Sequence, residues 1–296
     1  GGKMVKSLVD KNILVTGASS GIGYQAALDL ARSGAFVILC GRDASRCQQA
    51  RERILAAVPG AAVEYLVADL SSQSQVRRLA EETTTLLASR GSGLDVLVNN
   101  AGLYSSPRVI TEDNVELTFA VNHLAPFLLT HLLLPVLTRA PEGRVLGVSS
   151  ESHYHSFFSP LSAHNPAIYI GLPAYATSNL SRVLFSAEFN RRTPVTSLRA
   201  WSVDPGLVDT EIGTKSKGFL ATLVWESRRK YGTTADVPSR TIQHLATAPF
   251  DEIFADLYWK DSAPKPPSRA SRDPLLASRL WEQSCRLCGI SDYFMF

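Results

Sequence analysis

The chain has 296 residues, 45% of them hydrophobic, and a formal net charge of +3 at pH 7. This length and hydrophobic content are sufficient for a substantial buried core. Because the net charge is small for this size, and Lys and Arg are scattered along the chain, the composition argues against a nucleic-acid-binding protein, and we expect no nucleic-acid partner.

Short apolar segments alternate with helix-like segments from the start of the chain. Strands are predicted at 12–15, 36–39, 63–67, 94–98, 144–148, 195–203 and 255–259. Helices are predicted at about 22–33, at 46–58, from a cap at Ser71 to Ser89, and in the long stretch between the fourth and fifth strands. Continuous apolar strands separated by helices are typical of a parallel sheet buried on both faces. We therefore predict an α/β fold with a doubly wound sheet of about seven strands in three layers.

No repeat or linker divides the chain, so we predict a single domain over 1–296 that begins with an N-terminal tail, 1–10. The Pro/Ser/Lys-rich residues 261–271 are expected to form an exposed loop before a last amphipathic helix. The longest apolar stretch, 121–137, contains two histidines and two prolines. We interpret it as a core helix and not as a membrane span.

The cysteines and histidines do not suggest a metal site. Cys285 and Cys288 have CxxC spacing, but they lie at the end of a predicted helix with no second pair. The six histidines form no ligand cluster along the sequence. We predict no metal and thiols kept reduced. Together with the absence of an apolar run at the start of the chain, this favours a cytoplasmic location, and membrane association of the protein stays open.

A glycine-rich turn joins the first predicted strand to the first helix. Residues 16–23 read Thr-Gly-Ala-Ser-Ser-Gly-Ile-Gly. Such a turn needs positions without Cβ so that a pyrophosphate can approach backbone N–H groups at a helix N-terminus. The spacing is GxxxGxG and differs from the more usual GxGxxG. We predict a dinucleotide site here, with candidate cofactor-binding residues Gly17, Ser19, Ser20, Gly21, Ile22 and Gly23.

The end of the second predicted strand indicates which dinucleotide binds. An NAD site has a carboxylate there for the ribose 2′-OH. This chain has Gly41 at that point, followed by Arg42 and Asp43. Arg42 could pair with a 2′-phosphate, which favours NADP (NADPH) as the cofactor. In the alternative interpretation Arg42 is a solvated surface residue and Asp43 a helix cap.

With these features in place, the sequence resembles the short-chain dehydrogenase/reductase family over nearly its whole length. The matching motifs are the turn at 16–23, Asp69-Leu70, Asn-Asn-Ala-Gly at 99–102, and Pro-Gly-xxx-Thr at 205–210. Residues 122–130, 149–153 and 184–192 are similar to retinol-dehydrogenase-like and WW-domain-oxidoreductase-like members. The resemblance implies a single NAD(P)-binding domain of Rossmann type, with further cofactor contacts at Asp69, Leu70, Asn99, Ala101, Gly102, Pro205, Gly206, Val208 and Thr210.

The resemblance also implies catalytic residues, and at one of them the chain departs from the family motif. Tyr175 matches the catalytic tyrosine, Ser150 the serine, and Asn122 an asparagine that orders a water in the proton relay. The motif YxxxK reads Tyr-Ala-Thr-Ser-Asn here, so Asn179 replaces a lysine that binds ribose and lowers the pKa of the tyrosine. A free tyrosine has a pKa of about 10. Asparagine can still bind ribose, but it carries no charge.

Three explanations of Asn179 stay open at this stage. The protein is a weakened but active reductase, or it has lost its chemistry and binds a nucleotide or a partner, or another group supplies the charge. Reduction uses the neutral phenol as acid, so it suffers less than oxidation. The sequence alone predicts that Asn179→Lys raises NADPH-dependent carbonyl reduction at least about tenfold.

The substrate side is expected to be apolar. Residues 151–174 form a long connection with several apolar side chains, which either wall the pocket mouth or pack as a surface loop. Residues 212–232 occupy the family's lid position. Within them, 218–225 is apolar and followed by basic residues, a pattern that suits peripheral membrane contact, packing on the core, or a homo-oligomer contact.

We therefore expect an NADP(H)-dependent oxidoreductase that reduces an apolar ketone, aldehyde or quinone-like carbonyl to an alcohol by hydride transfer. Its substrate would be a lipophilic small molecule. The alternative is a catalytically weakened or inactive family member that acts as an NADP(H)-binding interaction or sensor protein.

Overall fold

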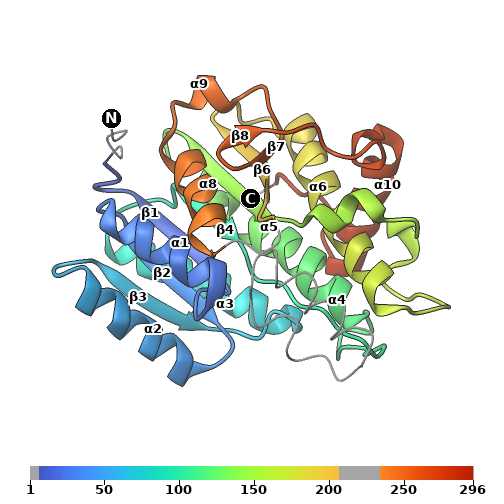
Figure 1. Ribbon diagram of the computed structural model, residues 1–296, viewed down its shortest axis with the longest axis horizontal. Helices are drawn as coiled ribbons and strands as arrows, with labels where there is room; N and C mark the ends of the chain where they lie inside the picture. The colour runs from blue at the N-terminus through green and yellow to red at the C-terminus, as the bar shows by residue number, and fades with distance from the viewer. Residues whose placement is uncertain (1–6, 207–233, 296) are drawn as a thin grey trace.

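The computed structural model describes residues 7–206 and 234–295. In these residues the strands form one eight-stranded sheet in the order β3-β2-β1-β4-β5-β6-β7-β8, parallel except for β8 (Figure 1). The strands are β1 (Asn12–Thr16), β2 (Phe36–Gly41), β3 (Val63–Val67), β4 (Val96–Asn99), β5 (Gly143–Val148), β6 (Leu198–Asp204), β7 (Tyr258–Lys260) and β8 (Ala263–Pro264). The predicted α/β class with a doubly wound, mainly parallel sheet is confirmed.

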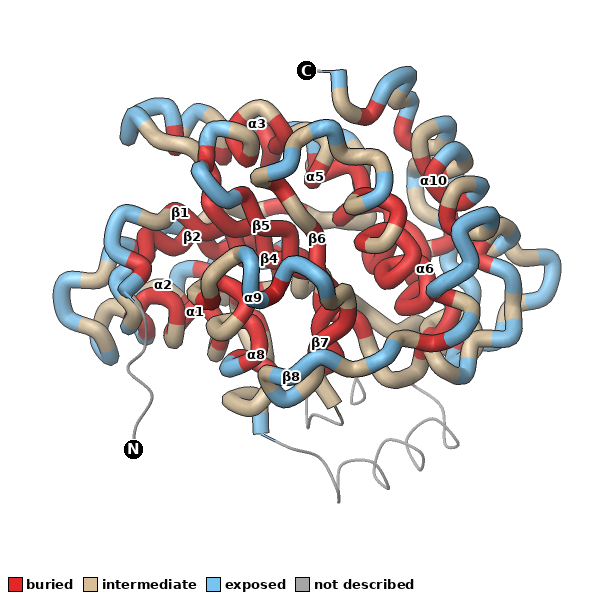
Figure 2. The backbone as a smooth tube through the Cα atoms, turned by 90° about the horizontal axis from the view of Figure 1, so that it is seen from above, coloured by how far each residue is buried: buried red, intermediate tan, exposed pale blue. Residues whose placement is uncertain are grey.

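Helices cover both faces of the sheet, which explains why the strands are continuously apolar. Alternate residues of β1 point to opposite faces: Ile13 and Val15 belong to one hydrophobic cluster and Leu14 to the other. The first face carries α1 (Gly21–Arg32), α2 (Ala44–Ala57), α8 (Asp236–Thr247) and α9 (Phe250–Ile253). The second carries α3 (Gln73–Ser89), α4 (Leu117–Phe119), α5 (Ala125–Leu137), α6 (Gly171–Arg192) and α10 (Pro274–Cys288). Figure 2 shows the resulting buried centre.

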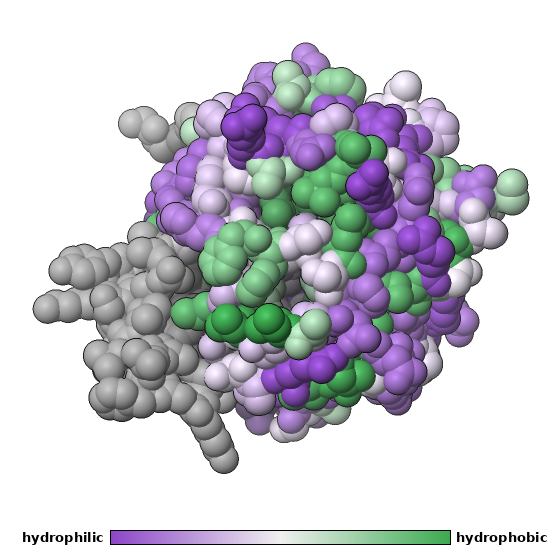
Figure 3. All heavy atoms as spheres, turned by 90° about the vertical axis from the view of Figure 1, so that its right-hand side faces the viewer, coloured by the Kyte–Doolittle hydropathy of each residue, from purple (hydrophilic) through white to green (hydrophobic). Residues whose placement is uncertain are grey.

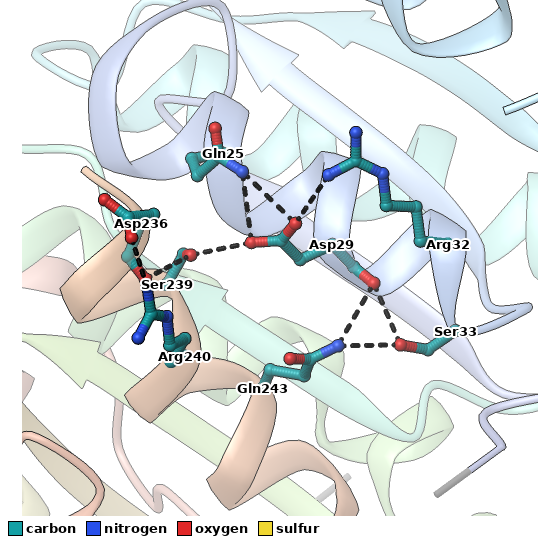
Figure 4. Close-up of polar contacts among 8 residues, drawn as sticks. All are labelled: Gln25, Asp29, Arg32, Ser33, Asp236, Ser239, Arg240 and Gln243. Carbon is teal, nitrogen blue, oxygen red and sulfur yellow. Dashed lines mark hydrogen bonds and ion pairs between the residues drawn. The ribbon is translucent and has the colours of Figure 1, made fainter. Parts of the chain in front are cut away.

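Polar contacts join α8 to α1, although about 200 residues separate them in sequence (Figure 4). The Ser239 hydroxyl donates to the Asp29 carboxylate at 2.7 Å, and the Gln243 amide donates to the Ser33 hydroxyl at 2.9 Å. Within α1, Gln25 also donates to Asp29. These bonds hold α1 in place beside α8. They therefore also fix the direction of the N-terminus of α1, which faces the site described below.

Two local expectations are corrected, and a third is not tested. Residues 261–271 are not simply an exposed loop, because they contain β8 and two buried serines, Ser268 and Ser271. The edge of β7 supplies backbone partners to β8, and a short apolar pattern could not reveal them. The cap of α3 is Ser72, whose hydroxyl accepts from the Gln75 N–H, whereas Ser71 donates to Asp69. The predicted lid, 212–232, lies outside the described residues.

The helical stretch between β4 and β5 is apolar enough to cross a membrane by length and composition, with a mean hydropathy of 1.5 over its best window. However, 83% of that window is buried inside the protein. The stretch Leu117–Leu137 packs against α3 and the sheet as a core helix. It contains a π-helical turn, η1 (Ala120–Leu124), of the kind that often marks a functional site.

The π-helical turn also buries a histidine whose titration should affect stability. The Nε2 atom of His123 lies 2.8 Å from the Ser284 hydroxyl of α10, and burial, followed by the Arg182 charge, lowers the pKa of His123 to about 3. The unfolded chain binds this proton near pH 6.5. His123 therefore contributes stability above about pH 6.5 that is lost as the pH falls toward about 3.

We predict that His123→Gln reduces the acid sensitivity of the fold. Between pH 7.5 and pH 5, the melting temperature of the wild type should fall about 2–4 °C further than that of the variant. Thermal melts of both proteins in matched buffers measure this difference. Equal losses in the two proteins would show that His123 does not resist protonation in the folded state.

Candidate functional site

A cavity of about 500 Å³ lies at the carboxyl ends of β1 to β5. Its centre is beside β1 and β4, where the strand order reverses direction, which is the usual place for a ligand in an open α/β sheet. The volume suits a small molecule or cofactor. The lining residues are Gly17, Ser19, Ser20, Gly21, Ile22, Cys40, Gly41, Arg42, Asp43, Arg46, Ala68, Asp69, Leu70, Asn100, Ala101, Gly102, Leu103, Tyr104, Val121, Asn122, Val148, Tyr175, Asn179 and Arg182.

The glycine-rich turn after β1 forms one wall of the cavity. Gly17 and Gly21 have φ angles of +65° and +57°, a conformation that favours glycine. The N-cap of α1, Ser20, makes no capping bond with its side chain. The first-turn N–H groups of α1 are therefore oriented toward the cavity at the positive end of the helix dipole, an arrangement that suits an anion.

Gly23 does not line the cavity, but it allows the turn to pack. A Cβ atom at Gly23 would lie 2.4 Å from both the Asn100 Nδ2 atom and the Gly17 oxygen. The Asn100 side-chain amide donates to the Thr16 backbone carbonyl at 2.9 Å, and the Ala101 N–H donates to the Thr16 hydroxyl at 3.0 Å. These bonds join the turn after β1 to the segment after β4.

Of the two neighbouring asparagines at the end of β4, Asn100 lines the cavity and Asn99 does not. Asn99 is buried behind it, and its amide donates to the Thr130 hydroxyl at 3.3 Å. Asn100 was not among the residues predicted from sequence. The alternation of side chains along a strand was the signal that could have separated the two, but it depends on knowing where β4 ends.

The end of β2 carries basic side chains, and among the described residues the one lining carboxylate at this end is that of the helix cap Asp43. Asp43 accepts from the Arg46 N–H at 2.9 Å and so caps α2. A Cβ at Gly41 would lie 2.7 Å from the Cys47 sulfur, so a larger residue could not stand there unless the neighbouring chain moved. Arg42 and Arg46 both line this end of the cavity, and Arg46 was missed in the sequence analysis.

Asp69 and Leu70, which follow β3, also line the cavity. The Asp69 carboxylate accepts from the Ser71 N–H at 2.9 Å and from the Ser71 hydroxyl at 2.7 Å, which holds this turn in place. Pro205 and Gly206 follow β6, and the Gly206 N–H donates to Asp204. Neither is among the lining residues. Val208 and Thr210 lie outside the described residues.

Tyr175 lines the opposite end of the cavity from Arg42. It lies near the start of α6, and its ring packs edge-on against Tyr104, with ring centroids 6.2 Å apart. Asn179 follows one helical turn later and is buried. Its amide donates to the Tyr175 carbonyl at 3.0 Å and is 3.4 Å from the Ser152 hydroxyl. The amide nitrogen of Asn179 is thus bonded within the protein.

Asn122 lies on the π-helical turn and contacts α6 from the other side. Its amide donates to the Ser178 hydroxyl and to the Leu103 carbonyl, both at 2.9 Å, and its side-chain oxygen accepts from the Leu103 N–H. The structure thus brings Asn122, Tyr175 and Asn179 together at one end of the cavity.

Ser150 is placed differently from these three residues, because it does not line the described cavity. It caps the short helix η2 (Glu151–His155), and its hydroxyl accepts from the Ser152 N–H at 3.2 Å. Its carbonyl lies 2.8 Å from the Nδ1 atom of His153, a buried histidine whose pKa is lowered, mainly by burial. The neighbouring Ser149 hydroxyl donates to the Asn179 carbonyl at 3.1 Å.

Arg182 is the lining residue of greatest consequence that the sequence analysis did not identify. It lies on α6, seven residues after Tyr175, and only 5% of it is exposed. Its guanidinium donates to the carbonyls of Ala101, Asn122 and Val148, which belong to three different segments around the cavity. The spacing 175, 179, 182 follows one helix face, which was the available signal.

The connection from β5 to α6 does not line the described cavity, but it exposes apolar side chains. Phe157 is 75% exposed and Ile168 is 71% exposed, and Ile170 is also exposed. A Cβ atom at Gly171 would lie 2.9 Å from the Tyr104 hydroxyl, so this connection reaches the cavity wall. Figure 3 faces this side of the molecule and shows apolar side chains at its surface.

Comparison with known proteins identifies the family. The short chain dehydrogenase family matches residues 11–218. A WW domain-containing oxidoreductase of Gallus gallus is 36% identical over 95% of this chain and 69% of its own length. Polyprenol dehydrogenase of Mus musculus is 37% identical over 93% and 83%, and retinol dehydrogenase 13 of Homo sapiens is 33% identical over 95% and 85%.

Solved structures agree with this match. A protein from Mycobacterium Paratuberculosis superposes with a TM-score of 0.74 and 29% identity, covering 97% of this chain and 96% of that one. A metagenomic short-chain oxidoreductase in complex with NADP superposes with a TM-score of 0.60 and 27% identity, covering 82% and 94%. The chain therefore belongs to the short-chain dehydrogenase/reductase family of oxidoreductases, in the branch that includes retinol dehydrogenases and WW domain-containing oxidoreductases.

Proposed function

We propose that the protein is an NADP(H)-dependent oxidoreductase that reduces an apolar ketone, aldehyde or quinone-like carbonyl to an alcohol. The observation that carries this proposal is the cavity itself, which has an anion-binding helix end at one side and Tyr175 at the other. The exposed apolar side chains of the connection from β5 to α6 support a lipophilic substrate. Relatives named for retinol and polyprenol point the same way.

The residues present fit NADP(H). The turn at Gly17 to Ile22 would hold the pyrophosphate, Asp69 and Leu70 the adenine, and Arg42 with Arg46 the 2′-phosphate. Gly41 stands where NAD-binding sites have an acid, and Asp43 is used as a cap. Asn179 would contact the nicotinamide ribose through its side-chain oxygen, and Pro205, Gly206, Val208 and Thr210 would close this end of the site. When bound, NADPH supplies the hydride.

The side chains around Tyr175 would handle the proton. Tyr175 would donate the phenol proton to the oxygen of the substrate as the carbonyl becomes an alcohol. Asn122 would keep Leu103 and Ser178 in place beside it through its three hydrogen bonds. Ser150, which caps η2, would orient the same substrate carbonyl, as the resemblance to the family implies.

One observation favours a second function, an NADP(H)-binding interaction or sensor protein with little turnover. Asn179 carries no charge where the family motif has a lysine, and its amide is bonded to the Tyr175 carbonyl. The cofactor cavity does not depend on that lysine. Nucleotide binding could therefore persist after the chemistry is lost.

Kinetics with a panel of lipophilic aldehydes, ketones and quinones separate the two functions. We expect NADPH consumption with at least one carbonyl, and a loss of about 10²–10⁴-fold in Tyr175→Phe. Binding of NADPH without turnover of any carbonyl would support the second function. If calorimetry detected no association with NADPH or NADH, both functions would be rejected.

The preference for NADPH should depend on the two arginines at the end of β2. We predict that Arg42→Ala weakens NADPH binding about tenfold and leaves NADH binding nearly unchanged, because only NADPH carries the 2′-phosphate. Arg46→Ala should act in the same direction. Calorimetric titration with both nucleotides measures the change, and an equal loss for NADH would contradict the assignment.

Four further predictions concern the whole chain and rest on the sequence. We propose that residues 1–296 form one domain in a cytoplasmic protein. The expected membrane contact through 218–225 lies outside the described residues and stays a prediction. The same holds for a homo-oligomer.

A further inference from the structure

Arg182 is a buried cation at the tyrosine end of the cavity. It lines the cavity together with Tyr175, Asn179 and Asn122. Residues seven apart on a helix lie on the same face two turns on, so Tyr175 and Arg182 project from α6 in a similar direction. Asn179, the neutral residue at the position of the motif lysine, lies between them on this face.

The surroundings of Arg182 satisfy its hydrogen bonds but leave its charge uncompensated. Its three hydrogen-bond partners are backbone carbonyls, those of Ala101, Asn122 and Val148. Within residues 7–206 and 234–295, no carboxylate pairs with it. A buried positive charge held by neutral dipoles keeps its field, because little water or counter-charge screens it. That field acts on the cavity that Tyr175 lines.

We propose that Arg182 is a positioning residue that supplies, from two helical turns beyond Tyr175, the positive charge that Asn179 lacks, and so favours the phenolate form of Tyr175. This inference rests on the proposed role of Tyr175 as the acid of carbonyl reduction. It selects the third of the explanations left open by the sequence, in which another group provides the charge.

The electrostatic coupling between these two residues supports the proposal. Burial lowers the pKa of Arg182 to about 10, and the charge of a Tyr175 phenolate raises it. Arg182 therefore keeps its proton at neutral pH. Interaction between two titrating groups is mutual, so a phenolate that stabilises the guanidinium is itself stabilised by it.

Other titratable groups at this end of the cavity do not provide the charge. Tyr104 packs edge-on against Tyr175, and a tyrosine side chain carries no positive charge. His123, on the π-helical turn beside Arg182, has its pKa lowered to about 3 by burial and the Arg182 charge, so it is neutral as well. His153, near Ser150, also has a lowered pKa because of burial.

The π-helical turn explains how Arg182 is held at this point. A π-helical turn interrupts the regular i to i+4 bonding of a helix, which leaves room for an outside donor. The Asn122 carbonyl belongs to this turn and accepts from the Nε atom of Arg182. In the family this asparagine is expected to organise a water of the proton relay. In this chain its carbonyl binds the guanidinium.

The test measures the titration of Tyr175 in the protein without nucleotide or substrate. Tyrosinate absorbance at 295 nm is recorded from pH 7 upward until the signal of Tyr175 reaches its plateau or the protein unfolds, and the curve of a matching Tyr175→Phe protein is subtracted each time. Arg182→Gln and Arg182→Met remove the charge, and Arg182→Lys keeps it. We expect the midpoint for Tyr175 to move up by about one pH unit in both neutral variants, a tenfold loss of phenolate, and less in Arg182→Lys.

Arg144→Gln is the matched control. Arg144 is also 5% exposed and donates to two backbone carbonyls, those of Leu245 and Ala248. Unlike Arg182 it also pairs with a carboxylate, that of Glu142, and it lies on β5 under α8, away from the cavity. The substitution Arg144→Gln should leave the titration midpoint of Tyr175 unchanged. Melting curves confirm that each variant is folded.

The outcomes of this test distinguish the proposed role of Arg182 from the proposed function as a carbonyl reductase. An unchanged midpoint in folded Arg182→Gln or Arg182→Met would overturn the role of Arg182, even if carbonyl reduction is observed. A raised midpoint confined to the Arg182 variants would support it, even if no carbonyl of the panel is turned over. Equal shifts in Arg182→Gln and Arg144→Gln would show a general effect of lost packing and would also overturn the proposal.

Discussion

Gly23→Ala should abolish measurable NADPH binding, with an affinity loss of at least about 100-fold. The added Cβ would lie 2.4 Å from the Gly17 oxygen and from the Asn100 amide nitrogen, closer than any real contact of a Cβ. Both atoms belong to the bonds that join the glycine-rich turn to the segment after β4. The turn must therefore move away, and its N–H groups would no longer converge on a diphosphate.

Gly147→Ala is the control for this substitution. Gly147 lies on β5, where a Cβ would have its nearest neighbour, the Trp201 oxygen, at 3.8 Å, an ordinary contact. The Gly147→Ala protein should bind NADPH with the affinity of the wild type. Calorimetry measures the affinity, and melting curves show whether each protein is folded. Wild-type affinity in a folded Gly23→Ala protein would mean that the turn does not hold the dinucleotide, which removes the basis of both proposed functions.

The fold could be predicted from sequence because the chain signals it locally. Strands such as Ile13 to Val15 are apolar on both faces, and only a sheet covered on both sides explains that. The glycines of the turn, placed between a strand and a helix, likewise indicate a tight turn in which a pyrophosphate can approach backbone N–H groups. Both features are contained in a few consecutive residues, so no long-range contact was needed to interpret them.

The parts that could not be predicted depend on contacts between distant segments. Asn99 and Asn100 are equivalent in sequence, and only the last residue of β4 decides which of them faces the cavity. β8 exists because β7 offers it an edge. In the sequence, Arg182 cannot be distinguished from the other basic residues. Its role becomes visible only in the folded chain, where three separate segments bring the carbonyls of Ala101, Asn122 and Val148 around it.

The position of Arg182 changes the result expected from restoring the motif lysine. From the sequence alone, Asn179→Lys should raise carbonyl reduction at least about tenfold. With Arg182 already in place, a lysine at 179 adds a second buried cation on the same helix face, where the two charges repel each other. Its benefit to Tyr175 should then be small, and it should lower the melting temperature.

We therefore predict that the effect of Asn179→Lys depends on residue 182. In the wild-type background kcat/KM for carbonyl reduction should change by less than about threefold. In the Arg182→Gln background it should rise at least about tenfold, because among the described residues the lysine then supplies the buried positive charge on the helix face of Tyr175. Melting curves should show the reverse order, with the larger destabilisation in the protein that has both cations.

This comparison distinguishes two explanations of the activity that remains although residue 179 carries no charge. If Arg182 acts on Tyr175, the two substitutions are strongly non-additive, since either cation can stabilise the phenolate and the second adds little. If Arg182 only holds the carbonyls together, the lysine gives the same gain in both backgrounds. Equal gains, measured from pH 6 to pH 9, would therefore return the chain to the simpler description of a reductase weakened at its motif lysine.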